Sequence, residues 1–191
     1  TDNMDYQYSP IYAEGGKIFL YTNYGAPKGR IMTADINKPG VSQWKELIPE
    51  QQNVLNGVDV INHQLILNYS QDACDHAFVY GLDGKMRHEV KLPMPGSVGF
   101  TGSKVGEECF YAFSSLTMPA TIYRYDMDKN ESTLYGQPNI KFRQQDYESQ
   151  QLFFFSKDGT RVPMFITYKK GMKRNGKNPV FLYGYGGFNI S

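Results

Sequence analysis

Residues 17–24 read KIFLYTNY, and similar runs return as HQLILNYS at residues 63–70 and ECFYAFSS at residues 108–115. Each run is short, apolar and rich in aromatic residues, a pattern typical of a β-strand. Successive runs begin about 45 residues apart, a period in the range of propeller blades. This internal repeat decides the fold class.

A second series of runs keeps the same phase: RIMTADI at 30–36, HAFVYGL at 76–82 and TIYRYDM at 121–127. Turn signals follow them at residues 37–40, 83–84 and 128–130, before the short runs WKELI, HEVKL and STLYG. Each unit is therefore predicted to hold three or four strands. Four-stranded sheets repeated radially form a β-propeller, and the sequence lacks the long amphipathic helices of a helical solenoid. Three units do not close a ring, so the fold class predicted is mostly β, with a partial propeller.

The repeat of about 45 residues ends near Ile140. We interpret residues 1–140 as a partial propeller domain, residues 141–151 (KFRQQDYESQQ) as a polar connection, and residues 141–191 as the start of a second domain. In the second domain, residues 153–171 predict a hairpin that turns at Asp158–Gly159, and Pro163 favours an edge position or a strand start.

The stretch PVFLYGYGGFNIS at residues 179–191 predicts a strand, Val180–Tyr183, buried on both faces and followed by a glycine loop around Tyr185. A hairpin, a turn, a buried strand and a glycine loop are how an α/β sheet begins, although no crossover helix confirms it. A dinucleotide-binding loop is excluded because the sixth position counted from Gly184 is Asn189.

Two interpretations of this loop stay open. In one it is a tight turn in which Tyr183 and Tyr185 are core aromatics. In the other it supplies hydrogen-bond donors to a developing oxyanion, as the glycine-rich loop after the third strand of α/β-hydrolases does. Tyr185 suits the second role because a phenol with a pKa near 10 stays protonated at neutral pH.

Composition excludes several classes of function. The 20 Lys and Arg balance the 19 Asp and Glu, with no run of like charge, so we expect no nucleic acid and no anionic membrane as partner. No apolar stretch reaches the roughly 20 residues of a membrane span. The chain begins TDNMDYQYSP, and we expect the native N-terminus to lie upstream.

Two cysteines, Cys74 and Cys109, are too few for a disulfide framework and suit buried thiols or a reducing compartment. The stretch DACDH at residues 72–76 mixes possible metal ligands but lacks a second spaced pair, so no metal site is expected.

The segments KDGTRVPMFITYKKG and NPVFLYGYGGFNIS resemble the start of the catalytic domain in the prolyl oligopeptidase family, and TNYGAPKGRIMTADI, VSQWKELIPE and SVGFTGSKVGEECFYAFSS are similar to its later propeller blades. The resemblance implies a cytoplasmic or periplasmic serine peptidase in which a seven-bladed propeller caps an α/β-hydrolase domain. Such an enzyme cleaves short peptides after proline without a metal or organic cofactor. By the same resemblance, Tyr185 is the oxyanion donor and Phe188 lines the proline-binding pocket.

The catalytic triad that this resemblance implies has no counterpart in the chain. The sequence holds no G-x-S-x-G elbow, and His63, His76 and His88 all precede the tyrosine loop, whereas the family's triad follows it. We therefore expect the chain to be an inactive internal fragment that self-associates through exposed strand edges. Two alternatives remain: a freestanding propeller module that binds peptides or proteins without catalysis, and a catalytic relative that is not a peptidase.

Overall fold

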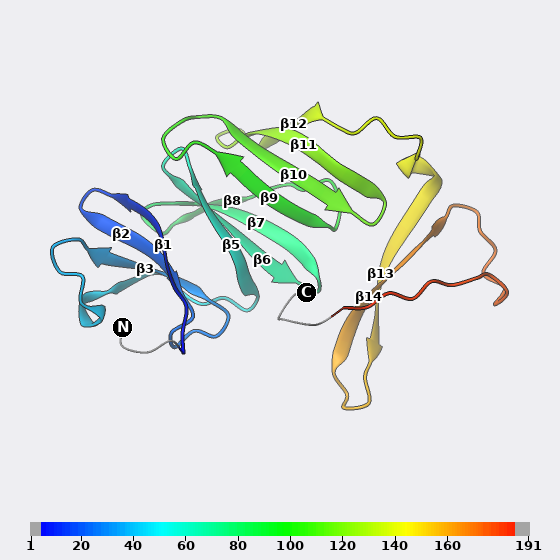
Figure 1. The fold of residues 1–191 in the computed structure, drawn as a ribbon, viewed down its shortest axis with the longest axis horizontal. Coiled ribbons are helices and arrows are strands. Elements are labelled where there is room, and N and C mark those ends of the chain that lie inside the picture. Colours follow the sequence, from blue (N-terminus) through cyan, green and yellow to red (C-terminus); the bar gives the residue numbers. More distant parts are fainter. Residues whose placement is uncertain (1–4, 186–191) are drawn as a thin grey trace. The chain divides into compact units, whose positions relative to one another are not determined.

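The computed structural model describes residues 5–185. Fourteen β-strands and two 3₁₀ helices, η1 (Val41–Gln43) and η2 (Gln144–Asp146), make up the regular structure of these residues (Figure 1). The predicted mostly-β class is therefore confirmed. Between residues 5 and 185, no helix combines the length and apolarity needed to cross a membrane.

Three four-stranded antiparallel sheets follow one another along the chain, each with its strands in sequence order. The first sheet contains β1 (Tyr8–Glu14), β2 (Lys17–Thr22), β3 (Arg30–Asp35) and β4 (Lys45–Ile48). The second contains β5 (Val54–Ile61), β6 (Gln64–Gln71), β7 (Cys74–Gly81) and β8 (Met86–Glu89). The third contains β9 (Ser97–Gly102), β10 (Cys109–Ser115), β11 (Met118–Asp126) and β12 (Glu131–Gly136). The sheets coincide with the three sequence repeats, which confirms the partial propeller.

Local turn chemistry sets the hairpins within these sheets. The two-residue turns Gly15–Gly16, Asn62–His63 and Asp72–Ala73 place both residues at positive φ, between 47° and 76°. Two consecutive positive φ angles match the type I′ turn, whose twist suits that of the flanking strands. Asn, Asp and Gly adopt this conformation more readily than other residues, so these turns favour tight pairing of neighbouring strands.

The sheets pack face to face through side chains that alternate along the strands. One core cluster joins the first and second sheets and consists of Ile31, Ile48, Leu55, Val60, Leu65, Leu67 and Tyr69. The first strands of successive sheets are also in contact, β1 with β5 and β5 with β9 (Figure 1). This arrangement is that of neighbouring blades whose first strands lie closest to a common axis.

The predicted hairpin after the repeats is present as a two-stranded sheet of β13 (Tyr147–Phe155) and β14 (Arg161–Lys169). Pro163 lies opposite Phe153, and both strands are edges, which agrees with the position predicted for a proline. At the turn, Asp158 accepts hydrogen bonds from the Ser156 hydroxyl and the Thr160 N–H, and these bonds lower its pKa to about 2.

Two expectations for this region are wrong. Residues 141–151 are not wholly a connection, because Tyr147–Gln151 pair with Phe165–Lys169 as part of β13. Polar side chains suit a strand that faces solvent, which is why composition alone misplaced the boundary. Val180–Tyr183 form no strand, and their side chains are 78–89% exposed. A strand buried on both faces needs neighbours on both sides, and the described residues provide none for it.

The chain divides into two compact units. One runs from the start of the described chain to Ser115 and includes Pro119–Pro138; the other holds Leu116–Met118 and the described chain from Asn139. The three sheets fall in the first unit, apart from the first residue of β11, and the hairpin falls in the second.

Candidate functional site

Tyr185 is the last residue that the structure describes, at the end of a segment without regular structure. Its side chain is 58% exposed and that of Tyr183 is 78% exposed. In this structure both tyrosines are exposed and neither is a core aromatic. A Cβ built on Gly184 would meet no atom within 4 Å, so there is open space beside the backbone just before Tyr185. Phe188 lies outside the described residues.

The three histidines belong to the sheet region, and their ring nitrogens meet carboxylates or phenols. His63 Nδ1 lies 2.9 Å from Glu14 Oε2, and His76 Nδ1 lies 3.1 Å from Glu89 Oε1. His88 Nε2 lies 2.8 Å from the Tyr125 hydroxyl. None of these three contacts, all within residues 5–185, pairs a histidine with a serine, as a nucleophile and its general base would be paired. The contacts instead join separate strands and sheets.

The contact between His88 and Tyr125 belongs to a network that joins the second and third sheets. Asn130 Nδ2 donates to the carbonyl of Glu89 at 2.9 Å, which turns Oδ1 of the same amide toward Tyr125. The Tyr125 hydroxyl donates to that Oδ1 at 2.8 Å and has no second hydrogen to give. His88 Nε2 must therefore carry a hydrogen and donate to the phenol oxygen.

The environment of this network favours the neutral forms of the His88 imidazole and the Tyr125 phenol. Burial lowers the pKa of His88, while the Asp128 carboxylate acts more weakly in the opposite direction. Burial also raises the pKa of Tyr125 well above its ordinary value. The sequence marked residues 128–130 only as a turn. The positive φ of 55° at Asn130 is the local feature that aims its amide at the neighbouring sheet.

A second polar cluster joins β1 of the first sheet to the connections between the first and second strands of the other two sheets. The backbone N–H groups of Asn62 and His63 donate to the carbonyls of Ser103 and Lys104, at 3.1 and 2.9 Å. Lys104 Nζ then reaches the carbonyl of Ile11 on β1 at 3.1 Å. Hydrogen bonds from the His63 ring and from the Tyr12 hydroxyl lower the pKa of Glu14. The cluster is thus a polar link between sheets.

The candidate metal ligands in residues 72–76 have structural partners. Cys74 is buried in β7 and forms no disulfide, Asp75 accepts a hydrogen bond from the N–H of Val98, and His76 contacts Glu89. Within residues 5–185, no three His, Cys, Asp or Glu side chains group as metal ligands would. Cys109 is also buried and forms no disulfide, and burial raises its pKa to about 12, so it is not a reactive thiolate.

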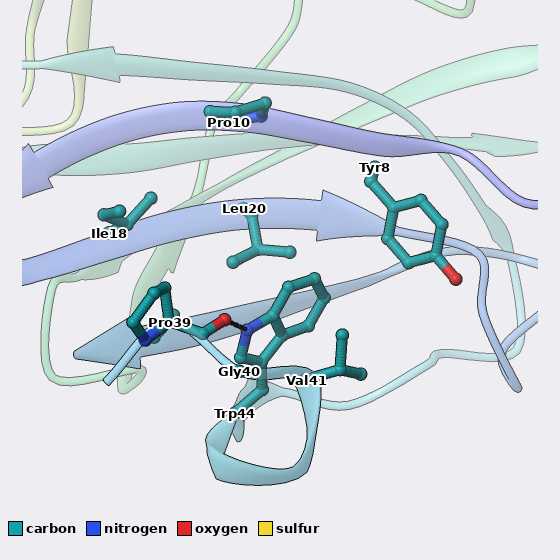
Figure 2. A pocket seen from close by; sticks show the side chains of 9 residues that line it. Tyr8, Pro10, Ile18, Leu20, Pro39, Gly40, Val41 and Trp44 are labelled. Carbon is teal, nitrogen blue, oxygen red and sulfur yellow. Dashed lines mark hydrogen bonds between the residues drawn. The ribbon is translucent and has the colours of Figure 1, made fainter. Parts of the chain in front are cut away.

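A pocket of about 370 Å³ lies on the first sheet, and sequence reasoning did not anticipate it. Figure 2 shows Trp44 beside Leu20, with its indole Nε1 donating to the carbonyl of Pro39 at 2.9 Å. The pocket is lined by Tyr8, Pro10, Ile18, Leu20, Ala34, Pro39, Gly40, Val41 and Trp44. The Tyr8 phenol is the one ionisable group in this lining, and burial raises its pKa. The pocket therefore suits apolar contact and has no pair of groups for acid–base chemistry.

Comparison with known proteins places these features in a family. The family described as prolyl oligopeptidase, N-terminal beta-propeller domain, matches residues 1–138. The chain is 38% identical over 179 residues to a prolyl endopeptidase of Elizabethkingia meningoseptica, covering 93% of this chain and 25% of that protein. It is 36% identical over 203 residues to a prolyl endopeptidase of Dictyostelium discoideum, covering 100% of this chain and 27% of that protein.

Solved structures agree. A chain from a structural and mechanistic study of two prolyl endopeptidases superposes with a TM-score of 0.84 at 31% identity, covering 91% of this chain and 26% of that one. Prolyl oligopeptidase B from Galerina marginata, bound to a 35mer hydrolysis and macrocyclization substrate, gives a TM-score of 0.80 at 25% identity. This match covers 90% of this chain and 25% of that one. The chain thus spans about a quarter of the length of its relatives. With the repeated sheets and the family match over residues 1–138, the chain belongs to the prolyl oligopeptidase family.

Proposed function

We propose that the protein carrying this chain is a serine endopeptidase that hydrolyses short peptides after proline through an acyl-enzyme. The observation that carries the proposal is the continuity of the match. The likeness to prolyl endopeptidases runs past residue 138 and, for the Dictyostelium relative, covers the whole chain. The chain thus resembles these enzymes on both sides of the propeller boundary, which favours a peptidase over a freestanding propeller module.

We also propose that residues 1–140 are part of the propeller domain and residues 141–191 begin the α/β-hydrolase domain. The family match ends at residue 138, and the division between the compact units falls between Pro138 and Asn139. The hairpin β13–β14 has no counterpart in the four-stranded repeats. These observations support a change of domain near residue 140.

In this proposal, Tyr185 donates a hydrogen bond to the oxyanion that forms when the substrate carbonyl is attacked. A neutral phenol can give one directed donor without losing its proton at neutral pH. The exposure of the Tyr185 side chain and the open space at Gly184 support a role toward a ligand. Phe188, three residues further on, would line the proline-binding pocket.

The nucleophile, the general base and the acid that orients the base would come from other parts of the protein, because no residue of this chain fits those roles. Acyl transfer of this kind needs no metal or organic cofactor. Its substrates would be short proline-containing peptides in the cytoplasm, or in the periplasm of a bacterium. The two buried cysteines, which form no disulfide, are compatible with either compartment.

The test compares the full-length protein with the 191-residue chain. The full-length protein should release a reporter from a peptide with proline before the scissile bond, should act far more slowly on the alanine analogue, and should be labelled once by a fluorophosphonate probe. The 191-residue chain should neither release the reporter nor be labelled by the probe. Peptide binding by the full-length protein without cleavage or labelling would contradict the proposal and support the binding module. Stoichiometric labelling of the 191-residue chain would contradict the assigned absence of a nucleophile.

A further inference from the structure

The dipeptide Asn–Gly occurs twice in the sequence, at Asn56–Gly57 and at Asn175–Gly176. Both asparagines are exposed, but their backbones differ. Asn56 and Gly57 lie within β5, whereas Asn175 and Gly176 lie in the bend that precedes residues 179–185. We propose that Asn175 is a site of spontaneous deamidation, which converts it to aspartate and isoaspartate, and that the fold protects Asn56 from the same reaction.

The reaction needs only the protein and water. The backbone nitrogen of the glycine loses its proton and attacks Cγ of the asparagine side chain. A C–N bond forms, the bond from Cγ to the side-chain nitrogen breaks, and ammonia leaves. Water then opens the resulting succinimide at either carbonyl, which yields aspartate or isoaspartate. No electron transfer takes place. Glycine favours the first step because the absence of Cβ leaves its nitrogen accessible and its backbone free to rotate.

The geometry at Asn175 brings the reacting atoms together. Asn175 Oδ1 accepts a hydrogen bond from the backbone N–H of Lys177 at 3.0 Å. This hydrogen bond closes a ring that contains Cγ of Asn175 and the nitrogen of Gly176, so it folds the side chain over the nucleophile. The accepted hydrogen bond also draws electron density from Cγ and makes it more electrophilic.

The surroundings of Gly176 favour loss of its amide proton. Lys173, Arg174 and Lys177 flank the dipeptide in the sequence, and nearby positive charge stabilises an anionic nitrogen. Gly176 has a φ of +74°, and a Cβ built on it would meet no atom within 4 Å. The side on which the succinimide forms is therefore unobstructed.

The strand holds Asn56–Gly57 away from this geometry. Asn56 lies at a register shift of β5, but both of its neighbours are paired with β6, Leu55 with Tyr69 and Gly57 with Asn68. Closing the five-membered ring therefore requires part of β5 to leave the sheet. Two exposed copies of one dipeptide thus differ chiefly in backbone freedom.

Deamidation at Asn175 would alter the path of the backbone that leads to Tyr185. The isoaspartate product places an extra carbon in the main chain, and both products replace a neutral amide with a carboxylate. The turn is braced by the bond from Lys177 to Asn175 and by a second bond of 2.7 Å from Asn178 Nδ2 to the carbonyl of Lys173. Lengthening the backbone within this hydrogen-bonded turn changes the direction in which the chain continues into residues 179–185.

The experiment incubates the full-length protein at mildly alkaline pH and follows chymotryptic peptides by mass spectrometry, with isoaspartyl methyltransferase labelling to detect isoaspartate. The peptide containing Asn175 should gain the mass of an amide-to-acid change at least about tenfold faster than the peptide containing Asn56, and its rate should rise with pH. Asn178 provides a control in the same region, because the nitrogen of Pro179 has no proton to lose.

Two variants and one condition complete the design. Asn175→Gln and Gly176→Ala should each suppress the reaction, the first by lengthening the side chain and the second by hindering the nitrogen. In denaturant, Asn56 and Asn175 should react at similar rates, because the fold no longer separates them. Equal rates at the two sites in the folded protein, or an Asn175 that keeps its amide while Asn56 loses it, would overturn the proposal.

Discussion

The carboxylate of Asp75 accepts a hydrogen bond from the backbone N–H of Val98 at 2.8 Å, which ties the second sheet to the first strand of the third. Asn68 Nδ2 donates a hydrogen bond to the backbone carbonyl of Val98 at 3.2 Å. β9 is an edge strand of its sheet, so these two side chains satisfy backbone groups that would otherwise face outward. The interface between neighbouring sheets thus includes directed hydrogen bonds as well as apolar packing.

This relationship predicts that Asp75→Ala destabilises the sheet region. Removing the carboxylate leaves the N–H of Val98 without its acceptor, which costs about 1–3 kcal/mol when the donor stays buried. Glu107→Ala is a matched control on an exposed loop and should change the free energy of unfolding by less than about 0.5 kcal/mol. Denaturant unfolding of both variants measures the difference. Equal stability of the two variants would show that water replaces Asp75 at no cost.

The network of His88, Tyr125 and Asn130 predicts a pH-dependent contribution to stability. Burial lowers the pKa of His88 in the folded state, so the unfolded chain binds the proton more tightly. The contribution is then complete above the ordinary histidine pKa of about 6.5 and is lost as the pH falls through that value toward the folded pKa. An NMR titration of the His88 ring should give a midpoint below about 6.5.

His88→Gln and Tyr125→Phe provide a double-mutant cycle for the same contact. The two substitutions should couple by about 0.5–1.5 kcal/mol at neutral pH, and the coupling should persist at acidic pH, because protonation adds a hydrogen at Nδ1 and leaves the Nε2–H donor in place. Additive effects at both pH values would show that the 2.8 Å contact contributes nothing of its own to stability.

Gly29→Ala should be more destabilising than Gly16→Ala, although both glycines have a positive φ, +85° and +76°. A Cβ on Gly29 would lie 2.5 Å from the Tyr21 ring, whereas one on Gly16 meets no atom within 4 Å. Gly16→Ala should cost about 1–2 kcal/mol from backbone strain alone, and Gly29→Ala should add about 1–3 kcal/mol from overpacking. Thermal unfolding of the two variants decides whether the Tyr21 ring can move aside.

If the full-length protein is the proposed peptidase, Tyr185→Phe should lower its kcat by about a hundredfold to a thousandfold, equivalent to about 2.7–4 kcal/mol of transition-state stabilisation. KM should change much less, because the hydrogen bond to the oxyanion forms chiefly in the transition state. Steady-state kinetics beside a melting curve separates the two interpretations of the loop. A normal kcat with a lowered melting temperature would assign Tyr185 a structural role instead.

The 191-residue chain in isolation should self-associate, because the pocket on the first sheet is an exposed apolar surface and β12 is an exposed edge strand with unpaired backbone groups. Val41 lines that pocket and is 38% exposed, whereas Val105 is 65% exposed in a polar loop. Val41→Glu should weaken self-association measured by light scattering, and Val105→Glu should not. A compact monomer at all concentrations would contradict the prediction.

The sequence by itself determined the three repeated units and the hairpin at Asp158–Gly159. The evidence for them is local, because short apolar runs and turn residues act within a few positions of one another. Family resemblance also identified Tyr185 and Phe188 as candidates, and their catalytic roles stay predictions.

Only the tertiary structure decided which strand begins each sheet. β1, β5 and β9 carry Pro10, Gly57 and Gly99 within mixed polar and apolar residues, so no local pattern marks them as strongly as the strands that follow. Their place depends on contact with the neighbouring sheet, as the bond between Asp75 and Val98 illustrates. The same dependence on partners explains the wrong prediction for Val180–Tyr183, since an apolar run becomes a buried strand only where other chain segments pair with it and cover it.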